Sequence, residues 1–259
     1  MAPRIVIAAI GGPTNSGKTT LAKHLTRILP AGSLSLFQDD FAPPSEMVPV
    51  DPVHGWQDWD DAAGAIQWEK QREALRYLRE TGTFPEAHYS HDHLNIQVPV
   101  PVSEEVVVHW RRKFEELVKG EEEKPTFVIA DGFLLLVDPE SVRHFDVRLF
   151  VREDQATLKK RREERAGYHT AGLENPEGSL WQDPPNYWEL CVWPAYLRAH
   201  SPLFVDGNVE TGTIDPEAIE GVKLFEAKEM GMEKMVVQAL EAIYETVKSG
   251  RRAGDWKKP

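Results

Sequence analysis

The stretch from Gly12 to Thr19, "GPTNSGKT", contains residue types that bind phosphate when they occur at this spacing. It matches the pattern G-x-x-x-x-G-K-[ST] in full, with an apolar run before it and a helical pattern after it. In that context the amides of a glycine-rich loop and of a helix N-terminus converge on phosphate oxygens. Lys18 then reaches the β- and γ-phosphates of a nucleotide, and the Thr19 hydroxyl binds Mg²⁺. The alternative is a glycine-rich turn without a ligand, which the order of strand, loop and helix disfavours.

Carboxylates follow two further apolar runs. The string "QDDF" places Asp39 and Asp40 after one run, and "IADGF" places Asp131 after another. A carboxylate at the end of a strand can accept the proton of an attacking hydroxyl or bind the Mg²⁺ held by Thr19. Each of these positions also has a plainer interpretation as a turn aspartate.

A group of cations occupies the string "LKKRREER" at 158–165. Arg161 and Arg165 are four residues apart, so they share one face of a predicted helix and can bind phosphates together. The alternative is a solvent-exposed face on which they pair with neighbouring glutamates.

The elements that must position these residues alternate along the chain. Short apolar runs typical of buried parallel strands occur at 4–10, 33–37, 126–130, 147–151 and 202–205. Helical patterns occupy 17–29, 62–80, 154–166 and 233–248. This order predicts an α/β fold of the P-loop kinase type, a doubly wound parallel sheet of about five strands, whose ligands bind at the C-terminal ends of the strands.

Other segments interrupt that alternation. We expect a single domain over 1–249, with insertions at about 82–103 and 209–232, a lid at about 158–190, and a disordered tail at 250–259. The first insertion contains "HYSHDH", whose three histidines invite a zinc interpretation. Because their spacing lacks a helix or a CxxC partner, we favour a polar loop.

Composition excludes several classes of protein. A formal net charge of -12 over 259 residues argues against general affinity for nucleic acid or anionic membranes. No run approaches the ~20 apolar residues that span a bilayer, and the single Cys191 rules out an intrachain disulfide. We therefore expect a soluble protein of the cytoplasm, with the nucleus as a second compartment. The sequence does not define an oligomeric state, and a monomer is the default.

Taken in chain order, these motifs resemble the uridine kinase-like group of small-molecule P-loop kinases. Within that group, three strings resemble the nicotinamide riboside kinase family: "GPTNSGKTTLAKHL" together with "QDDF", then "DWDD" at 58–61, then "PNYWELCVWPAYL" at 185–197. The resemblance covers most of residues 4–208. Two positions depart from the family pattern: Trp59 stands where a tyrosine is usual, and Asp131 where a glutamate is usual.

The resemblance implies roles for individual residues. Catalysis falls to Asp39, as the base, and Lys18. The implied ATP-binding residues are Gly12, Pro13, Thr14, Asn15, Ser16, Gly17, Lys18, Thr19, Thr20, Arg161, Arg165, Asp206, Gly207 and Asn208. The implied substrate-binding residues are Asp39, Asp40, Phe41, Trp59, Asp60, Arg162 and Tyr168. Of these, Trp59 and Tyr168 are implied to stack on the base of the nucleoside, and Asp60 to hold its ribose diol. The implied metal-binding residues are Thr19, Asp39 and Asp131.

The activity that the resemblance implies is ATP-dependent, Mg²⁺-requiring phosphorylation of the 5′-hydroxyl of nicotinamide riboside to give nicotinamide mononucleotide, in NAD biosynthesis. A uridine/cytidine kinase or another small-metabolite kinase of the same group is the nearest alternative. A regulatory P-loop NTPase or nucleotide-binding module is an alternative of another class.

Overall fold

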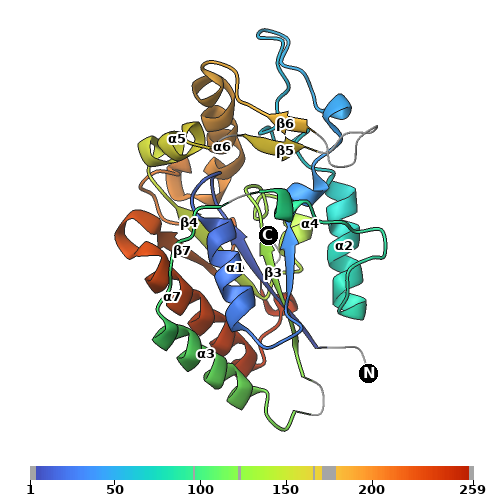
Figure 1. Ribbon diagram of the computed structural model, residues 1–259, viewed down its shortest axis with the longest axis vertical. Helices are drawn as coiled ribbons and strands as arrows, with labels where there is room; N and C mark the ends of the chain where they lie inside the picture. The colour runs from blue at the N-terminus through green and yellow to red at the C-terminus, as the bar shows by residue number, and fades with distance from the viewer. Residues whose placement is uncertain (1–3, 96, 122–123, 166, 171–178, 257–259) are drawn as a thin grey trace.

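The central sheet of this protein is built from five parallel strands (Figure 1). The computed structural model describes residues 4–95, 97–121, 124–165, 167–170 and 179–256. In sheet order the strands are β2 (Leu34–Phe37), β3 (Thr126–Asp131), β1 (Ile5–Gly11), β4 (Val147–Arg152) and β7 (Val222–Glu226). Neighbouring strands run parallel throughout. The predicted doubly wound α/β fold is confirmed.

Helices connect these strands. The α-helices are α1 (Lys18–Ile28), α2 (Trp68–Thr81), α3 (Glu104–Leu117), α4 (Pro139–Val142), α5 (Gln155–Glu163), α6 (Trp193–His200) and α7 (Ala227–Ser249). A π-helical stretch, Trp188–Val192, leads directly into α6. Short 3-10 helices occupy Gln38–Phe41, Ser45–Met47, Asp92–Leu94, Ser201–Leu203, Val205–Gly207 and Ala253–Asp255. A separate antiparallel hairpin pairs β5 (Tyr168–Thr170) with β6 (Ser179–Trp181).

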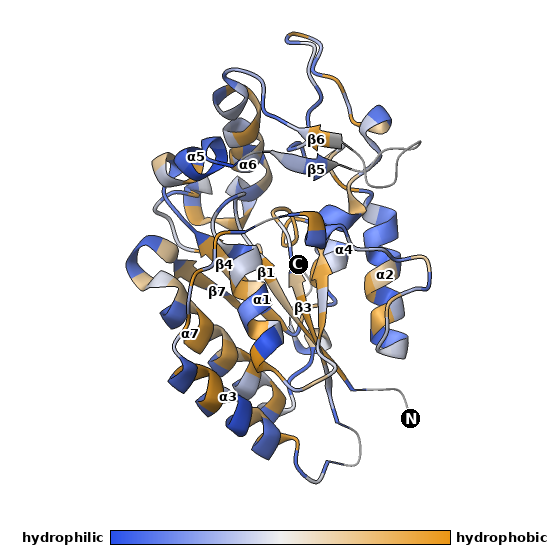
Figure 2. Ribbon diagram, in the orientation of Figure 1, coloured by the Kyte–Doolittle hydropathy of each residue, from blue (hydrophilic) through white to orange (hydrophobic). Residues whose placement is uncertain are grey.

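The core at the central sheet consists of two layers, one on each face of the sheet. Alternate residues of β1 supply both: Ile7 and Ala9 pack with α2, α4 and α6, whereas Ala8 and Ile10 pack with α1, α3 and α7. Successive strand residues point to opposite faces, so a strand covered on both sides is apolar throughout. Figure 2 shows this apolar character in the central strands and the polar outer surfaces of α3 and α7. None of the helices among the described residues has the length and apolarity needed to cross a membrane.

One predicted strand is wrong. Residues 202–205 do not join the sheet: Ser201–Leu203 is a 3-10 helix, and Phe204 makes only an isolated bridge to Ile214. The run is apolar because Leu203 and Phe204 lie in the core, and apolarity alone does not distinguish a strand from another buried segment. The fifth strand is β7, which lies inside the interval expected to be an insertion at 209–232.

Helix boundaries differ where side chains form local turns. The helix predicted over 62–80 begins only at Trp68, because carboxylates bind backbone amides before it: Asp58 accepts from the amides of Asp60 and Asp61, and Asp61 accepts from the amide of Ala63. The helix predicted over 154–166 ends at Glu163, and α3 was not predicted.

The tail is ordered over part of its length, contrary to expectation. Ala253 is buried, its amide donates to Asp146 Oδ1 at 2.7 Å, and the Trp256 indole donates to the Asp146 carbonyl at 3.2 Å. The prediction of a disordered tail is therefore wrong for residues 250–256. Residues 257–259 lie outside the described residues.

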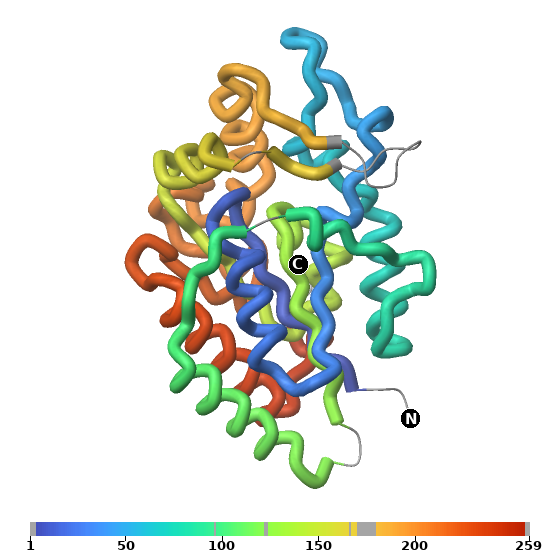
Figure 3. The backbone as a smooth tube through the Cα atoms, viewed as in Figure 1, coloured from blue at the N-terminus to red at the C-terminus, as the bar shows by residue number. Residues whose placement is uncertain are grey.

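The interval 82–103 connects the two sides of the molecule. Figure 3 shows the path of the chain from α2 to α3. It crosses the molecule at the end of the sheet where the strands finish and α1 begins (Figure 3). The described part of this interval contains no strand of the sheet, and its only helix is the turn Asp92–Leu94. The predicted lid at 158–190 comprises most of α5, the β5–β6 hairpin and the start of the π-helical stretch, while 166 and 171–178 lie outside the described residues.

Candidate active site

The phosphate-binding loop follows β1 directly. Gly12 has φ +132°, and a Cβ there would lie 2.2 Å from the carbonyl oxygen of Val151, so only glycine fits. Helix α1 begins at Lys18, and the Lys18 Nζ donates to the carbonyl of Pro13 at 2.7 Å. The lysine ammonium is therefore folded back over the loop, within reach of an anion placed there.

Lys18 is buried among carboxylates. Burial lowers the pKa of its ammonium, while Asp131 and Asp39 act in the opposite direction. The strands thus bring together three residues that are far apart in the sequence, because the C-terminal ends of β1, β2 and β3 meet at one edge of the sheet.

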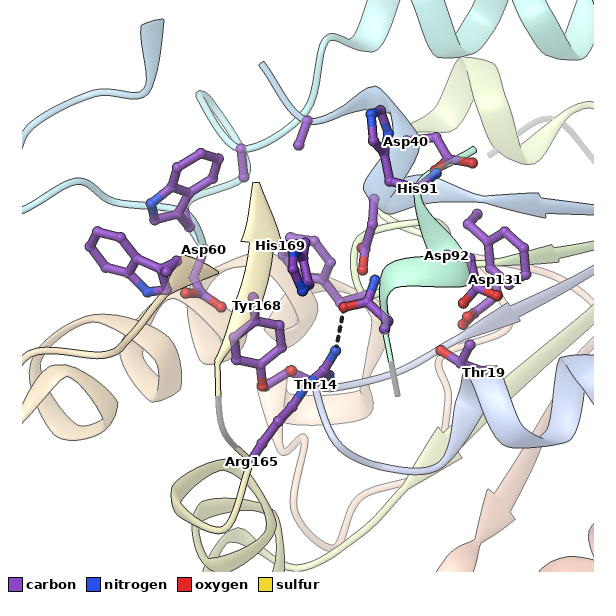
Figure 4. A pocket seen from close by; sticks show the side chains of 18 of the residues that line it. Thr14, Thr19, Asp40, Asp60, His91, Asp92, Asp131, Arg165, Tyr168 and His169 are labelled. Carbon is purple, nitrogen blue, oxygen red and sulfur yellow. Dashed lines mark hydrogen bonds between the residues drawn. The ribbon is translucent and has the colours of Figure 1, made fainter. Parts of the chain in front are cut away.

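A pocket at this edge is lined by ten of the predicted site residues. The predicted residues that line it are Thr14, Thr19, Asp39, Asp40, Trp59, Asp60, Asp131, Arg162, Arg165 and Tyr168. Figure 4 shows its two ends: Thr19 and Asp131 lie at one, and Asp60 and Tyr168 at the other.

The phosphate end contains buried polar atoms without partners. Burial raises the pKa of Asp131 to about 6, against the effects of Lys18 and of a hydrogen bond from Thr19. Asp131 Oδ1 and the Ser16 hydroxyl are buried and have no hydrogen-bond partner in the part of the chain that the structure describes. Buried polar atoms are costly when unpaired, so these two favour a polar ligand.

The same end fits Mg²⁺ bound together with a nucleotide. Within the described ranges no three His, Cys, Asp or Glu side chains converge as a metal site. Mg²⁺ in phosphoryl-transfer sites uses one or two protein oxygens plus phosphates and water, so Thr19 and Asp131 suffice without a protein-only cage.

Asp39 and Asp40 are neighbours with different surroundings. The Asp39 carboxylate is open to the pocket. Desolvation by the surrounding pocket walls raises its pKa, and Lys18 opposes that shift. Asp40 Oδ1 instead accepts from the Ser90 hydroxyl at 3.2 Å and the His91 amide at 2.9 Å, and burial raises the Asp40 pKa to about 7. Asp40 Oδ1 therefore fastens Ser90 and His91 beside the pocket, whereas the Asp39 carboxylate is exposed in the pocket. Asp40 also lines the pocket, and its Oδ2 has no hydrogen-bond partner among the described residues.

Aromatic residues form the far end of the pocket. The Trp59 amide donates to the Tyr187 hydroxyl at 3.0 Å, and the buried Trp59 indole nitrogen has no partner among the described residues. The Tyr168 hydroxyl donates to Asn15 Oδ1 at 2.8 Å, which connects the hairpin to the phosphate-binding loop. Trp59 is half-buried, with part of its ring facing the pocket.

Arg162 is the buried cation of this end. It contacts Asp60 at 3.3 Å and Asp183 at 2.5 Å, and its guanidinium lies 4.9 Å from the centre of the Tyr168 ring. Burial works against its charge, but Asp60, Tyr168 and Asp183 raise the pKa of Arg162 well above its usual value. It stays charged. Arg165 also stacks on Tyr168: its guanidinium lies 3.9 Å from the centre of that ring and donates to Asn95.

Three predicted residues or segments lie elsewhere. Phe41 is a buried core residue and does not line the pocket, so its role in shaping the pocket stays a prediction. Arg161 also does not line the pocket: its guanidinium donates to the Asn15 carbonyl at 3.2 Å and pairs with Glu153 at 3.3 Å. Asp206, Gly207 and Asn208 are exposed and do not line the pocket, so their role beside an adenine stays a prediction.

Sequence reasoning missed several lining residues. These are His91, Asp92, Asn95 and Gln97 from the 82–103 interval, and His169 and Trp181 from the hairpin. The density of polar and histidine residues in "HYSHDHLNIQ" was the available signal. This composition predicts a polar loop, and nothing in the sequence indicates which surface that loop covers. His88, one of the three histidines that invite the zinc interpretation, stacks on Phe84 with ring centroids 4.4 Å apart.

The parallel sheet, the glycine-rich loop after β1 and the acidic groups at the ends of β2 and β3 define a P-loop kinase-type domain. Comparisons with known proteins narrow this class. Three fungal proteins called nicotinamide riboside kinase are similar over most of this chain. The Schizosaccharomyces pombe protein is 32% identical, with 94% of this chain and 98% of its own length aligned. The Eremothecium gossypii protein is 33% identical, at 92% of each chain, and the Saccharomyces cerevisiae protein is 31% identical, at 86% of this chain and 88% of its own.

The chain belongs to the nicotinamide riboside kinase family. No protein-family model matches it. Among solved structures, a sugar kinase from Janibacter sp. HTCC2649 aligns with a TM-score of 0.46 at 12% identity, over 92% of this chain and 94% of that one. A possible uridine kinase from Bacillus stearothermophilus aligns with a TM-score of 0.43 at 16% identity, over 87% and 90%.

Proposed function

We propose that this protein transfers the γ-phosphoryl group of ATP to the 5′-hydroxyl of nicotinamide riboside, giving nicotinamide mononucleotide and ADP. One observation carries the proposal: a single pocket joins the phosphate-binding loop to a free carboxylate, Asp39, and then to an aromatic and carboxylate pair, Trp59 and Asp60. Such a pocket suits a nucleoside whose hydroxyl faces the phosphates. The names of the fungal relatives supply the substrate.

The chemistry assigns one task to each group. Asp39 accepts the proton of the 5′-hydroxyl while that oxygen forms its bond to the γ-phosphorus, and the bond from the γ-phosphorus to the β,γ-bridging oxygen breaks. Lys18 holds the β- and γ-oxygens as negative charge moves toward the leaving ADP. Thr19 and Asp131 would hold Mg²⁺, which would neutralise phosphate charge there. Asp60, an acceptor with two oxygens, binds the ribose hydroxyls.

The pocket shape favours transfer to an acceptor over simple hydrolysis. A regulatory NTPase needs a positioned water beside the γ-phosphate, but here the space beyond Asp39 extends to Trp59 and Tyr168. Aromatic faces at the end of the pocket away from the phosphate-binding loop are suited to a nucleoside base.

The test is product analysis. The purified protein is incubated with ATP, Mg²⁺ and nicotinamide riboside, uridine or cytidine in turn, and products are measured by mass spectrometry. We expect nicotinamide riboside to gain one phosphoryl group with equimolar ADP, and Lys18→Ala to abolish the gain. ADP without a phosphorylated nucleoside would instead indicate an NTPase, and preferential phosphorylation of uridine a pyrimidine nucleoside kinase.

A further inference from the structure

Asp183 lies behind the pocket and contacts two residues that line it. Its Oδ2 accepts from Arg162 Nε at 2.5 Å and its Oδ1 from Arg162 Nη2 at 3.1 Å. Its Oδ1 also accepts from the indole nitrogen of Trp181 at 2.9 Å. Asp183 follows the hairpin strand β6, so one carboxylate fixes both the buried arginine and an aromatic face.

Asp183 competes with Asp60 for the same guanidinium. Both Arg162 contacts to Asp60 measure 3.3 Å, which is longer than either contact to Asp183. Charge-assisted hydrogen bonds strengthen as they shorten, so Asp183 is the stronger partner. Arg162 is therefore drawn away from Asp60, whose oxygens keep acceptor capacity for a ligand in the pocket.

The corner of the pocket formed by Asp60, Arg162 and Tyr168 is surrounded by unequal numbers of acidic and basic groups. Asp60 and Asp183 place two carboxylates on the one guanidinium of Arg162. Asp58 contributes a third carboxylate, which acts on Asp60. Arg165, which stacks on the Tyr168 ring, is the second cation facing the corner, and its hydrogen-bond partner Asn95 is neutral. These groups are thus three carboxylates and two guanidiniums.

Aromatic faces line the same corner. The Trp59 and Trp181 rings lie 6.0 Å apart at an angle of 58°, and both line the pocket beside Tyr168. An aromatic face attracts a cation through its quadrupole, and tryptophan does so best. Negative charge and indole faces in one corner favour the same kind of ligand.

We propose that Asp183 is a specificity-determining residue: by holding Arg162 and Trp181 at the base end of the pocket, it favours nucleosides whose base is a cationic aromatic ring over those whose base carries no net charge. This inference rests on the proposed function, because the pyridinium of nicotinamide riboside is such a ring. Asp183 acts through its two neighbours and is a positioning residue.

The experiment compares two ligands that share one ring and one sugar. Nicotinamide riboside carries a net positive base, whereas the analogue with a carboxylate in place of the carboxamide carries a base of no net charge. The kcat/KM of nicotinamide riboside and the inhibition constant of the analogue against it are measured for the wild-type protein, Asp183→Asn and Asp183→Glu. The inhibition constant is measurable whether or not the analogue is itself phosphorylated.

We expect Asp183→Asn to lower kcat/KM for nicotinamide riboside about three- to tenfold, mainly through KM, since one charge is lost near the base. Binding of the analogue should be unchanged or tighter, and Asp183→Glu should restore most of the preference. The matched control is Asp61→Asn, which removes a carboxylate paired with Arg198 at 2.8 Å outside the pocket. It should change neither quantity.

Two results would overturn the inference. Equal weakening of both ligands in Asp183→Asn, with a lowered Tm, would mean that the residue only supports the fold. Unchanged kcat/KM for nicotinamide riboside would mean that it has no role at the site. Failure of the wild-type protein to phosphorylate nicotinamide riboside at all is a different outcome, which refutes the proposed function itself.

Discussion

Asp39 and Asp40 show what a single residue position decides at this site. Both follow β2 in the sequence, and the family resemblance implies that both face the substrate. The 3-10 turn Gln38–Phe41 directs Asp39 into the pocket and Asp40 toward Ser90 and His91. The sequence predicts an acidic group here because the strand ends here. It cannot predict which of two adjacent carboxylates a distant segment will bind.

The first prediction separates these two carboxylates. Asp39→Asn should lower kcat about 10²- to 10⁴-fold, because the amide keeps the shape of the side chain but cannot accept the proton. Asp40→Asn should cost only a few-fold, since its amide oxygen can still accept from Ser90 and His91. Measured kcat values for both variants check this, and a larger loss at Asp40 would reverse the assignment of the base.

The second prediction concerns Trp59, whose ring lies partly in the pocket and whose indole nitrogen has no partner within the described ranges. Trp59→Leu keeps apolar bulk but removes the π face. The kcat/KM for nicotinamide riboside should fall several-fold to about 30-fold, equivalent to ~1–2 kcal/mol of cation–π interaction. Thermal unfolding should change little. A large drop in Tm with equal losses on nicotinamide riboside and uridine would show that Trp59 is a packing residue.

At the scale of elements, the strands and α1 were predictable and the coverings of the pocket were not. Buried parallel strands have a distinctive apolar pattern, and β1, β2, β3 and β4 match it closely. The 82–103 interval has no such pattern, because it is held by scattered polar contacts. Asp92 pairs with Lys23 at 2.8 Å, and His24 contacts the Val100 carbonyl at 2.8 Å. Contacts of this kind depend on residues far along the chain.

The third prediction concerns His200, at the end of α6. The ring is buried beside Phe150, its Nδ1 lies 2.9 Å from the Tyr196 carbonyl, and burial lowers its pKa to about 4. Between roughly pH 6.5, the ordinary pKa of histidine, and about pH 4, the unfolded chain binds a proton there that the folded chain does not. Stability therefore falls as pH falls through this range.

The size of that effect is up to about 3 kcal/mol, from ~1.4 kcal/mol per pKa unit. His200→Gln keeps a donor for the Tyr196 carbonyl but does not titrate, so its packing cost is the same at every pH. Urea unfolding of both proteins from pH 7 to pH 4.5 should show the wild-type free energy of unfolding falling faster than that of the variant. Parallel curves would contradict the lowered pKa.

At the scale of the whole molecule, the site and the closing contacts of the chain lie at opposite edges of the sheet. The pocket forms where the strands end. Asp146, just before β4 begins, receives hydrogen bonds from the Ile7 amide, from Arg79 and from the Ala253 amide. The composition of "GRRAGDWKKP" predicts disorder, but a buried carboxylate from another part of the chain overrides that local tendency. Only the tertiary structure reveals this partner.

The last prediction follows from that separation. A chain ending after Gly250 loses the amide hydrogen bond to Asp146 and the Trp256 ring, which packs over Arg148 with 5.3 Å from guanidinium to ring centre. Leaving a buried acceptor short of one partner costs about 1–3 kcal/mol, and the lost packing adds to it, so we expect about 2–4 kcal/mol less stability. Activity per folded molecule should stay unchanged, because none of the lost contacts involves a residue that lines the pocket. A chain ending after Trp256 is the matched control and should unfold like the full-length protein. If the shorter chain were as stable as the control, the contacts of the tail with Asp146 would contribute nothing. If it were as stable but less active, the tail would influence the pocket through a route that these contacts do not provide.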